Sequence, residues 1–256
     1  MSRAIIGHTG FVGGNIARQV SFDDFYNSKS IESIAGKRYD LLVCSGARGE
    51  KWKANKDPIG DRENIDRLIG CLRKVSTLKL VLVSTVDVYP VPIEVDEETP
   101  IESRLASAYG RHRRVLERFV EDHFDSLIVR LPGLFGTGIK KNIIYDFMHH
   151  NNVDQIHPDS RFQFYWLDQL WRDIQIVLKH PITLVNFATE PISAEEVARE
   201  GFGILLSNRP QSPPAQYDFR TKHAALLGGD RGYLYTKEQV LTSLKHFLAD
   251  QNSQNQ

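Results

Sequence analysis

The sequence predicts an α/β protein built on a doubly wound parallel sheet, with a small lobe formed mainly by the C-terminal part of the chain. Apolar segments of strand length alternate with segments of helical periodicity as far as residue 132. The apolar segments are continuous, which indicates strands that are buried on both faces. This combination is typical of a parallel sheet that is covered by helices on both sides.

Each expected element is defined by its apolar pattern. Strands are expected at 3–7, 22–28, 39–47, 78–85, 126–132 and 182–188. Helices are expected from the end of the first strand to about Val20, over 61–75, 104–122, 140–150 and 192–202, and within 232–250, while 162–180 combines a strand-like start with a helix.

Helix boundaries are expected where capping residues occur. Asp61 is the expected N-cap of the helix over 61–75. Ser193 and Glu196, three residues apart, predict a capping box for the helix that follows them. Thr236 is the expected cap of the last helix, and the polar tail 251–256 is expected to be disordered.

The composition excludes several classes of function. Lys and Arg together number 32, Asp and Glu also number 32, and the formal net charge is zero. This balance argues against nucleic acid or an anionic membrane as a partner. The N-terminus lacks the apolar core of a signal peptide, and no segment reaches the roughly 18 apolar residues of a membrane span. Cys44 and Cys71 lie in apolar patterns and are expected to be reduced, so we expect a cytoplasmic protein.

Ligands of doubly wound folds bind beyond the carboxyl ends of the strands. The segments that follow the predicted strands are Gly7–Gly13, Ser45–Arg48, Ser84–Tyr89 and Pro132–Gly138. Metal binding is not expected, because the clustered residues His149, His150 and His157 have no matching carboxylate or cysteine pattern.

The segment GHTGFVGGNI places glycines at positions 7, 10 and 13, between the first strand and the first helix. Glycine allows a tight turn with positive φ and lets a phosphate approach the backbone. The N-terminus of the following helix offers N–H groups and a positive dipole end to a pyrophosphate. This context favours dinucleotide binding; the alternative is a tight turn without a ligand.

The end of the second strand bears on the choice between NAD and NADP. An NAD site often has an acidic residue about 20 residues after the glycine loop, to bind the ribose 2′-hydroxyl. Asp23 and Asp24 come too early for this role, and the strand is followed by Asn27, Ser28 and Lys29. These residues favour NADP, with NAD and a ligand-free polar turn as alternatives.

The segment SAYGRHRR contains Tyr109 and, four residues later, Arg113. On a helix these residues share one face. A fixed cation next to a phenol lowers its pKa, so the pair is a candidate acid–base group. The alternative is a solvated pair that stabilises the helix by about 0.2–0.5 kcal/mol.

Together these segments resemble the extended short-chain dehydrogenase/reductase family, which includes nucleotide-sugar epimerases, dehydratases and reductases. The glycine loop resembles the family's TGxxGxxG, and STVDVYP (84–90) resembles its strand-four signature. SAYGRHR (107–113) resembles its YxxxK, but Arg113 stands in place of the lysine. RLPGLFGTG (130–138) and EPISAEEVARE (190–200) resemble later segments, so that the resemblance covers most of the chain.

The resemblance implies a dinucleotide-binding Rossmann core over 1–133, completed by about 162–188, and a small substrate lobe over 134–161 and 189–256. It implies NADP, or NAD, as the cofactor. The implied cofactor-binding residues lie mainly in the loops after the strands: Gly7, Thr9, Gly10, Phe11, Val12, Gly13, Asn27, Ser28, Lys29, Ser45, Gly46, Ala47, Asn64, Pro132 and Gly133.

The resemblance also implies catalytic roles for Thr85, Tyr109 and Arg113. Tyr109 would donate the proton to a developing alkoxide, Thr85 would hold the same oxygen, and Arg113 would keep the phenol acidic. We therefore expect an NAD(P)-dependent oxidoreductase or epimerase that acts by hydride transfer on a small polar or sugar-type substrate. The alternative is a non-catalytic NAD(P)-binding sensor or scaffold that has lost the active-site lysine.

The substrate-binding candidates are Asp87, Lys140, Asn142, Arg161 and Tyr165. Dehydratases of this family carry Asp-Glu after the threonine, whereas this chain has Val86 and Asp87, so reduction or epimerisation fits better than dehydration. Lys140 and Asn142 are candidates for a substrate phosphate, with the start of a helix as the alternative. Family members often form dimers through the helices that correspond to 61–75 and 104–122, so a homodimer is compatible with the resemblance.

Overall fold

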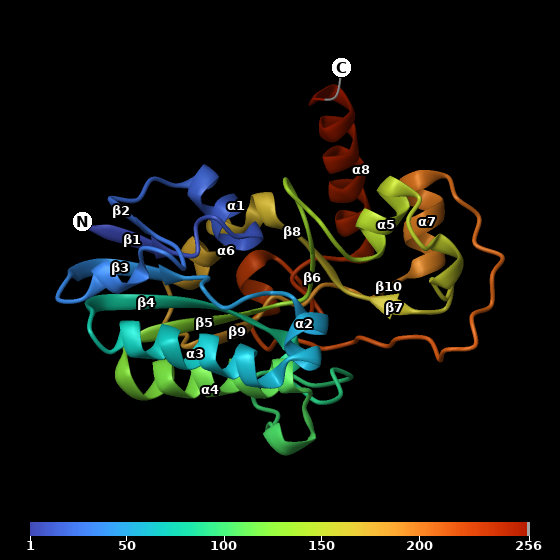
Figure 1. Ribbon diagram of the computed structural model, residues 1–256. Helices are drawn as coiled ribbons and strands as arrows, with labels where there is room; N and C mark the ends of the chain where they lie inside the picture. The colour runs from blue at the N-terminus through green and yellow to red at the C-terminus, as the bar shows by residue number, and fades with distance from the viewer. Residues whose placement is uncertain (255–256) are drawn as a thin grey trace. The chain divides into compact units, whose positions relative to one another are not determined.

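A computed structural model describes residues 1–254 (Figure 1). The chain forms two compact units. Unit 1 comprises Met1–Val91, Glu98–Leu131 and Asp168–Asn186, and unit 2 comprises Pro92–Glu97, Pro132–Leu167 and the chain from Phe187 onward. Every helix described for residues 1–254 is too short or too polar to traverse a bilayer.

Unit 1 contains a six-stranded sheet of order β2-β1-β3-β4-β5-β9, in which every pairing is parallel. Its strands are β1 (Arg3–Ile6), β2 (Asp24–Tyr26), β3 (Arg38–Cys44), β4 (Ser76–Thr85), β5 (Ser126–Leu131) and β9 (Leu184–Asn186). This confirms the predicted doubly wound α/β fold. Because β2 and β3 lie on opposite sides of β1, the loops after β1 and β3 diverge at a topological switch point, where such folds bind ligands.

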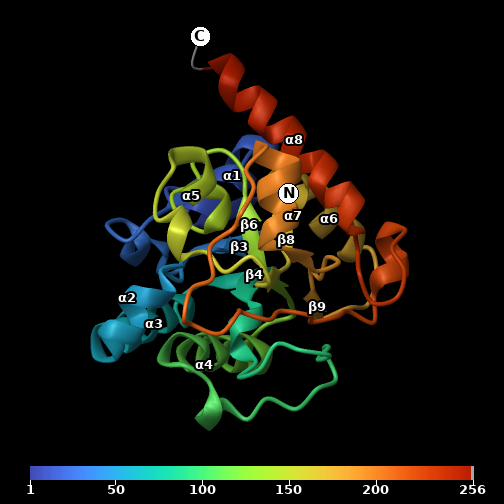
Figure 2. The same cartoon turned by 90° about the vertical axis from the view of Figure 1, so that its right-hand side faces the viewer.

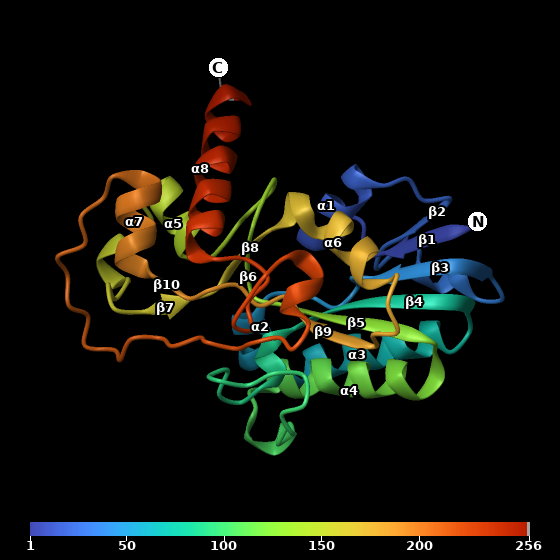
Figure 3. The ribbon, with the colours of Figure 1, turned by 180° about the vertical axis from the view of Figure 1, so that it is seen from behind.

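Helices cover both faces of this sheet (Figures 1 and 3). One face carries α1 (Phe11–Gln19) and α6 (Leu170–Val177), which are joined by a 3.0 Å hydrogen bond from the Trp171 N–H to the Gln19 side chain. The other face carries α3 (Pro58–Leu72) and α4 (Ala108–His123), which pack against each other. The connections include α2 (Lys51–Lys56), which the sequence analysis did not predict, and the short 3₁₀ turns η1 (Ile31–Ile34), η2 (Val86–Val88), η3 (Ser103–Leu105) and η5 (Leu167–Gln169).

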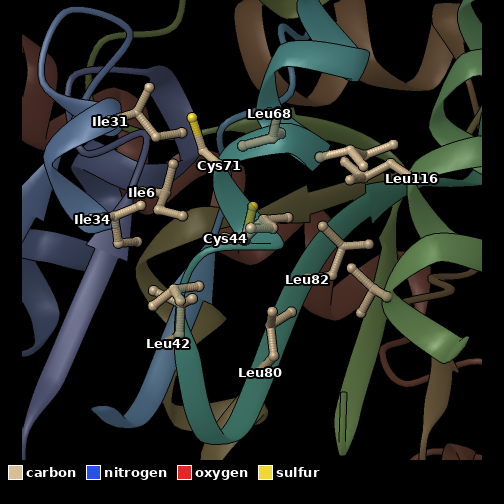
Figure 4. Close-up of a cluster of buried hydrophobic side chains, with 14 of the residues drawn as sticks. Ile6, Ile31, Ile34, Leu42, Cys44, Leu68, Cys71, Leu80, Leu82 and Leu116 are labelled. Carbon is tan, nitrogen blue, oxygen red and sulfur yellow. The ribbon is translucent and has the colours of Figure 1, made fainter. Parts of the chain in front are cut away.

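Apolar side chains fill the space between the sheet and the pair α3 and α4 (Figure 4). Leu42 and Leu82 project from neighbouring strands, and Leu116 meets them from α4. Cys44 and Cys71 are free and belong to this core, as predicted. Burial raises the pKa of the Cys44 thiol to about 11, so this thiol stays protonated at neutral pH.

Two helix starts differ from the predictions. The cap of α3 is Asp57, whose side chain accepts a hydrogen bond from the Gly60 N–H (3.0 Å), and not Asp61. Pro58 at the first helical position favours this start, because proline has no N–H that would need a partner. Helix α4 begins at Ala108 rather than at 104, because the preceding residues form the separate turn η3.

Up to residue 254, unit 2 contains two small two-stranded sheets and the helices α5, α7 and α8 (Figure 2). Its strands are β6 (Gly133–Phe135), β7 (Arg161–Phe162), β8 (Phe164–Trp166) and β10 (Ile192–Ser193). Strands β6 and β8 pair in parallel, and β7 and β10 pair antiparallel. The helices are α5 (Ile143–His149), α7 (Ala194–Phe202) and α8 (Lys237–Gln254), with 3₁₀ turns η4 (Val153–Gln155) and η6 (Ala224–Leu227).

The predicted caps of unit 2 are confirmed. Ser193 and Glu196 form the capping box of α7. Burial opposes ionisation of Glu196, but hydrogen bonds from Lys237 and Ser193 lower the pKa of its carboxyl to about 2. The Thr236 hydroxyl accepts a hydrogen bond from the Gln239 N–H at 3.3 Å, at the start of α8. The prediction for the tail is wrong for residues 251–254, which continue α8, while 255–256 lie outside the described residues.

Candidate functional site

The loop between β1 and α1 has no room for side chains at two of its glycines. Gly7 has φ +90°, and a Cβ there would lie 2.5 Å from the carbonyl oxygen of Ser45. A Cβ on Gly13 would lie 2.2 Å from the carbonyl oxygen of Gly7. These glycines therefore let the loop close tightly and let α1 approach the ends of β1 and β3.

The first turn of α1 is open to a ligand at its N-terminal end. Gly10 is the N-cap residue and provides no side-chain acceptor for the N–H groups of that turn. Thr9 and Gly10 are exposed, while Phe11 and Val12 are half-buried. Helix N-termini of this kind bind phosphate through their N–H groups and positive dipole end, so these residues fit a pyrophosphate.

The segment after β3 lies beside this loop. The Ser45 hydroxyl donates to the carbonyl oxygen of Ile6 at 2.9 Å. A Cβ on Gly46 would lie 2.9 Å from the Ile6 side chain, and Ala47 packs against the core. The structure thus brings the predicted residues of the β1 and β3 loops together, whereas the side chain of Asn64 donates to the Gly60 carbonyl of its own helix (2.5 Å).

The residues after β2 form a polar turn. The Asn27 side-chain oxygen accepts hydrogen bonds from the backbone N–H groups of Lys29 (2.8 Å) and Ser30 (3.3 Å), and Ser28 and Lys29 are exposed. Asp23 accepts from the Arg3 N–H at 2.7 Å, at the start of the neighbouring strand.

Asp24 also has a structural partner. Its carboxylate accepts a hydrogen bond from the Tyr39 hydroxyl at 2.5 Å. The Tyr39 hydroxyl lies 2.6 Å from that of Tyr26, within a buried group. Asp24 in β2 and Asp23 directly before it are therefore both engaged in holding β2 in place.

The two hydroxyl groups predicted to be catalytic lie together at the carboxyl end of β4. Thr85 is the last residue of β4, and Tyr109 lies in the first turn of α4, capped by Ser107. The Thr85 side chain hydrogen-bonds the Tyr109 phenol. A Cβ on Gly110 would lie 2.0 Å from the Asp87 carbonyl oxygen, so this glycine allows the start of α4 to approach the end of β4.

Arg113 lies over the face of the Tyr109 ring, with its Cζ atom 4.0 Å from the ring centroid. Its guanidinium donates to the Asp61 carboxylate and to the Arg48 carbonyl oxygen. Asp61 also bonds the His112 ring at 2.8 Å. All three charged or polar side chains are buried, so Arg113 joins α4 to α3 and to the β3 loop.

Arg113 lowers the pKa of the Tyr109 phenol, as expected, but burial has the larger effect. Burial raises the pKa of Tyr109 above its ordinary value of 10.0, and this effect exceeds the lowering of the pKa by Arg113 and by the Thr85 hydrogen bond. Asp87 raises the pKa further, and Lys51 lowers it. Tyr109 is thus protonated at neutral pH and suited to donate a proton.

Several residues around Tyr109 were missed by the sequence analysis. The Lys51 ammonium donates to the Asp87 carboxylate at 2.7 Å, and the Asp87 N–H donates to the Thr85 hydroxyl oxygen at 3.2 Å. The Tyr109 N–H donates to the Asn55 side chain at 3.1 Å. Lys51 and Asn55 belong to the unpredicted helix α2, and Asp61 was assigned only as a cap.

The remaining predicted site residues belong to unit 2: Pro132, Gly133, Lys140, Asn142, Arg161 and Tyr165. The Gly133 N–H donates to the Gln163 carbonyl oxygen at 3.0 Å, next to the half-buried Pro132. Lys140 and Arg161 are exposed. Asn142 caps α5 and donates to the Leu134 carbonyl oxygen at 2.8 Å.

Tyr165 is the one of these residues that lies deep in the core of unit 2. It is 1% exposed, and its ring packs against the rings of Phe187 and Tyr235. This packing stabilises the core of unit 2, and a role of Tyr165 in substrate binding stays a prediction. Among residues 1–254, no group of three His, Cys, Asp or Glu side chains is placed to hold a metal ion.

Comparison with solved structures identifies proteins of the same fold. A dTDP-4-dehydrorhamnose reductase from Bacillus anthracis, in complex with NADP, has a TM-score of 0.74 at 16% identity, over 98% of this chain and 99% of that chain. A UDP-glucose 4-epimerase from Thermotoga maritima, with UDP-glucose, has a TM-score of 0.73 at 13% identity over the whole of both chains.

An NAD-dependent NDP-hexosamine 5,6-dehydratase, TunA, involved in tunicamycin biosynthesis, has a TM-score of 0.70 at 17% identity over 98% of both chains. No family model and no curated protein sequence matches this chain. At these levels of identity the similarity establishes the fold.

Proposed function

We propose that this chain is an NAD(P)-dependent oxidoreductase or epimerase that acts on a carbonyl or hydroxyl carbon of a nucleotide-sugar or other small polar substrate. The observation that carries the proposal is the hydrogen-bonded pair of Thr85 and Tyr109 at the carboxyl end of β4. Hydride transfer to a carbonyl creates an alkoxide, which needs a proton donor within hydrogen-bond reach. The similar folds of a reductase, an epimerase and a dehydratase, all named for nucleotide-sugar chemistry, support the same class of reaction.

The glycine loop supports the cofactor assignment. A Cβ on Gly7 or Gly13 would collide with backbone atoms of neighbouring segments, so the loop requires glycine at both positions. The N-terminus of α1 has no side-chain cap and suits a pyrophosphate. Thr9 to Gly13 would hold the pyrophosphate, and Ser45 to Ala47 would flank it. A bound nicotinamide would supply or accept the hydride.

We further propose that NADP is preferred to NAD. The carboxylates of Asp23 and Asp24 are engaged by Arg3 and Tyr39, so neither serves a ribose 2′-hydroxyl. Ser28 and Lys29 are exposed after β2 and would receive a 2′-phosphate, because an ammonium and a hydroxyl donate to its oxygens.

Tyr109 would give its proton to the substrate oxygen, and Thr85 would hold that oxygen in place. The raised pKa of Tyr109 suits this direction, because the phenol carries its proton at neutral pH. The opposite direction requires a phenolate, which burial disfavours. Reduction of a carbonyl is therefore the reaction that these residues favour.

The second candidate is a non-catalytic NAD(P)-binding protein. The observation that favours it is the engagement of Arg113, whose guanidinium is bound to Asp61 and to the Arg48 carbonyl oxygen. The family's lysine, by resemblance, holds the ribose of the nicotinamide. Arg113 would have to leave buried partners to do the same.

Fluorescence titration with NADPH and with NADH tests binding. We expect both cofactors to bind, with a lower Kd for NADPH. If neither cofactor binds, both candidate functions are rejected. An assay of a panel of carbonyl compounds, monitored by the oxidation of NADPH, then separates the two candidates. If the protein is an enzyme, we expect turnover of at least one compound, and we expect this turnover to fall at least about 100-fold in Tyr109→Phe.

Tyr145→Phe is a matched control for that variant. Tyr145 lies on α5 of unit 2, with its ring stacked on His149, and its replacement should leave turnover unchanged. Binding of NADPH without any turnover would favour the non-catalytic candidate. Equal turnover in Tyr109→Phe and wild type would remove the assigned role of the phenol.

A further inference from the structure

Charged groups from three elements act on the ionisation of the Tyr109 phenol. They are Arg113 on α4, Asp87 in η2 and Lys51 on α2. Asp61 on α3 lies behind them, paired with Arg113. The contacts of each group show how firmly it is held in place.

Arg113 is held in a structural position. Its side chain is 3% exposed, it covers the face of the ring, and its donors meet Asp61 and the Arg48 carbonyl oxygen. A guanidinium that stacks on a ring and donates from its two terminal nitrogens to two different acceptors is not readily moved. Arg113 therefore joins α3 and α4, and this fixed cation lowers the pKa of the phenol more than Lys51 does.

Lys51 is placed differently. Helix α2 is anchored to the start of α4 by the 3.1 Å hydrogen bond from the Tyr109 N–H to Asn55. Lys51 precedes Asn55 by four residues and so lies on the same face of α2. Its ammonium donates to Asp87 at 2.7 Å, and its side chain remains 42% exposed.

Asp87 connects Lys51 to the hydroxyl pair. Its N–H donates to the Thr85 hydroxyl oxygen at 3.2 Å, and Thr85 hydrogen-bonds the Tyr109 phenol. Asp87 is 19% exposed, so its carboxylate is partly shielded from water and acts strongly on its neighbours.

We propose that Lys51, positioned by helix α2 and paired with Asp87, provides an ammonium group that tunes the Tyr109 phenol together with Arg113, the residue that stands at the family's lysine position by resemblance. Lys51 is a positioning residue, because its charge would act on a substrate only through the phenol. The proposal rests on the proposed function for its relevance to catalysis, but the electrostatic effect is measurable without cofactor or substrate.

The expected signs follow from the charges. Replacing Asp87 with asparagine removes an anion next to the phenol and leaves the Lys51 ammonium, so the pKa of Tyr109 should fall. Replacing Lys51 in that background removes the cation, so the pKa should rise again. A purely structural role of Lys51 would not produce this pair of opposite shifts.

The experiment is a pH titration of the Tyr109 phenol by ¹³Cζ NMR of tyrosine-labelled full-length protein, with Tyr109→Phe to identify the resonance. The variants are Asp87→Asn, Asp87→Asn/Lys51→Met and, as the matched control, Asp87→Asn/Lys53→Met. Lys53 lies on the same helix but pairs with Glu50 at the surface. Each titration covers the pH range in which circular dichroism shows a folded protein.

We expect Lys51→Met to raise the pKa of the phenol by about one unit in the Asp87→Asn background, a tenfold fall in the ionisation constant. Lys53→Met should change it by less than about 0.2 units, because the Lys53 ammonium pairs with Glu50 and not with Asp87. Equal values in the two double variants, or a fall on removal of Lys51, would overturn the proposal. So would a phenol in Asp87→Asn that shows no ionisation up to the alkaline limit.

The NADPH titration of the wild-type protein separates this inference from the proposed function. Absence of NADPH binding together with the expected phenol shifts would reject the function but keep the Lys51 effect. NADPH binding together with unchanged phenol ionisation would reject the Lys51 effect alone.

Discussion

Asp61 provides a strong test of the structural role of Arg113. The side chains of Asp61 and Arg113 are 6% and 3% exposed and form an ion pair, and Asp61 also holds His112. Asp61→Ala leaves a buried guanidinium without its counter-ion. Removal of one partner of a buried pair costs about 3–5 kcal/mol of the free energy of unfolding.

Asp66→Ala is the matched control on the same helix. Asp66 pairs with Arg62 four residues away, and both side chains are about half exposed. An exposed pair of this spacing contributes only about 0.3–0.5 kcal/mol. Urea unfolding at pH 7, followed by circular dichroism, should therefore separate the two variants by at least about 2 kcal/mol.

A double variant identifies the cause of the loss. Asp61→Ala/Arg113→Met removes the unpaired charge, and a methionine can occupy much of the apolar space of the arginine stem. We expect this protein to be more stable than Asp61→Ala alone. If Asp61→Ala costs no more than Asp66→Ala, or if adding Arg113→Met lowers stability further, the uncompensated charge is not the cause.

Further predictions concern the caps and the glycines. Ser193→Ala should lower the stability of unit 2 by about 1 kcal/mol in urea unfolding, because α7 loses its capping box. The pKa of Glu196 is lowered to about 2, so its contribution is present above about pH 4.5 and is lost as the pH falls toward 2; Glu196→Gln should flatten this acid dependence. Gly13→Ala should lower the melting temperature and weaken NADPH binding, because the new Cβ would lie 2.2 Å from a backbone oxygen. Gly70→Ala should instead stabilise α3 by about 0.5–1 kcal/mol, because a Cβ there has no atom within 4 Å and alanine favours a helix more than glycine does.

Local signals in the sequence were sufficient for most of the fold. The buried strands are continuous apolar runs, and the caps at Ser193 and Thr236 are short motifs whose bonding partners lie within three residues. The start of α3 could also have been predicted from the sequence, since Asp57 is followed by a proline at the first helical position.

The surroundings of Tyr109 could not be predicted in the same way. The stacking of Arg113 on the ring follows from helical spacing, but its partner Asp61 lies 52 residues earlier in the chain. Lys51 and Asp87 are 36 residues apart and meet only after α2 packs beside α4. Helix α2 itself is six residues long, too short to form without such packing.

The variant Arg113→Lys introduces the lysine that the family resemblance puts at position 113, and it tests what this position does. A lysine ammonium is a single point charge and lacks the planar fork that reaches Asp61 and the Arg48 carbonyl oxygen together. One buried acceptor would then lose its partner, at a cost of about 1–3 kcal/mol. If Arg113 is structural and Lys51 tunes the phenol, Arg113→Lys should lower stability in urea without raising kcat for any carbonyl that the wild-type protein reduces. A variant that keeps its stability and gains turnover would show instead that position 113 is the site of the catalytic cation, and that arginine there holds the activity down.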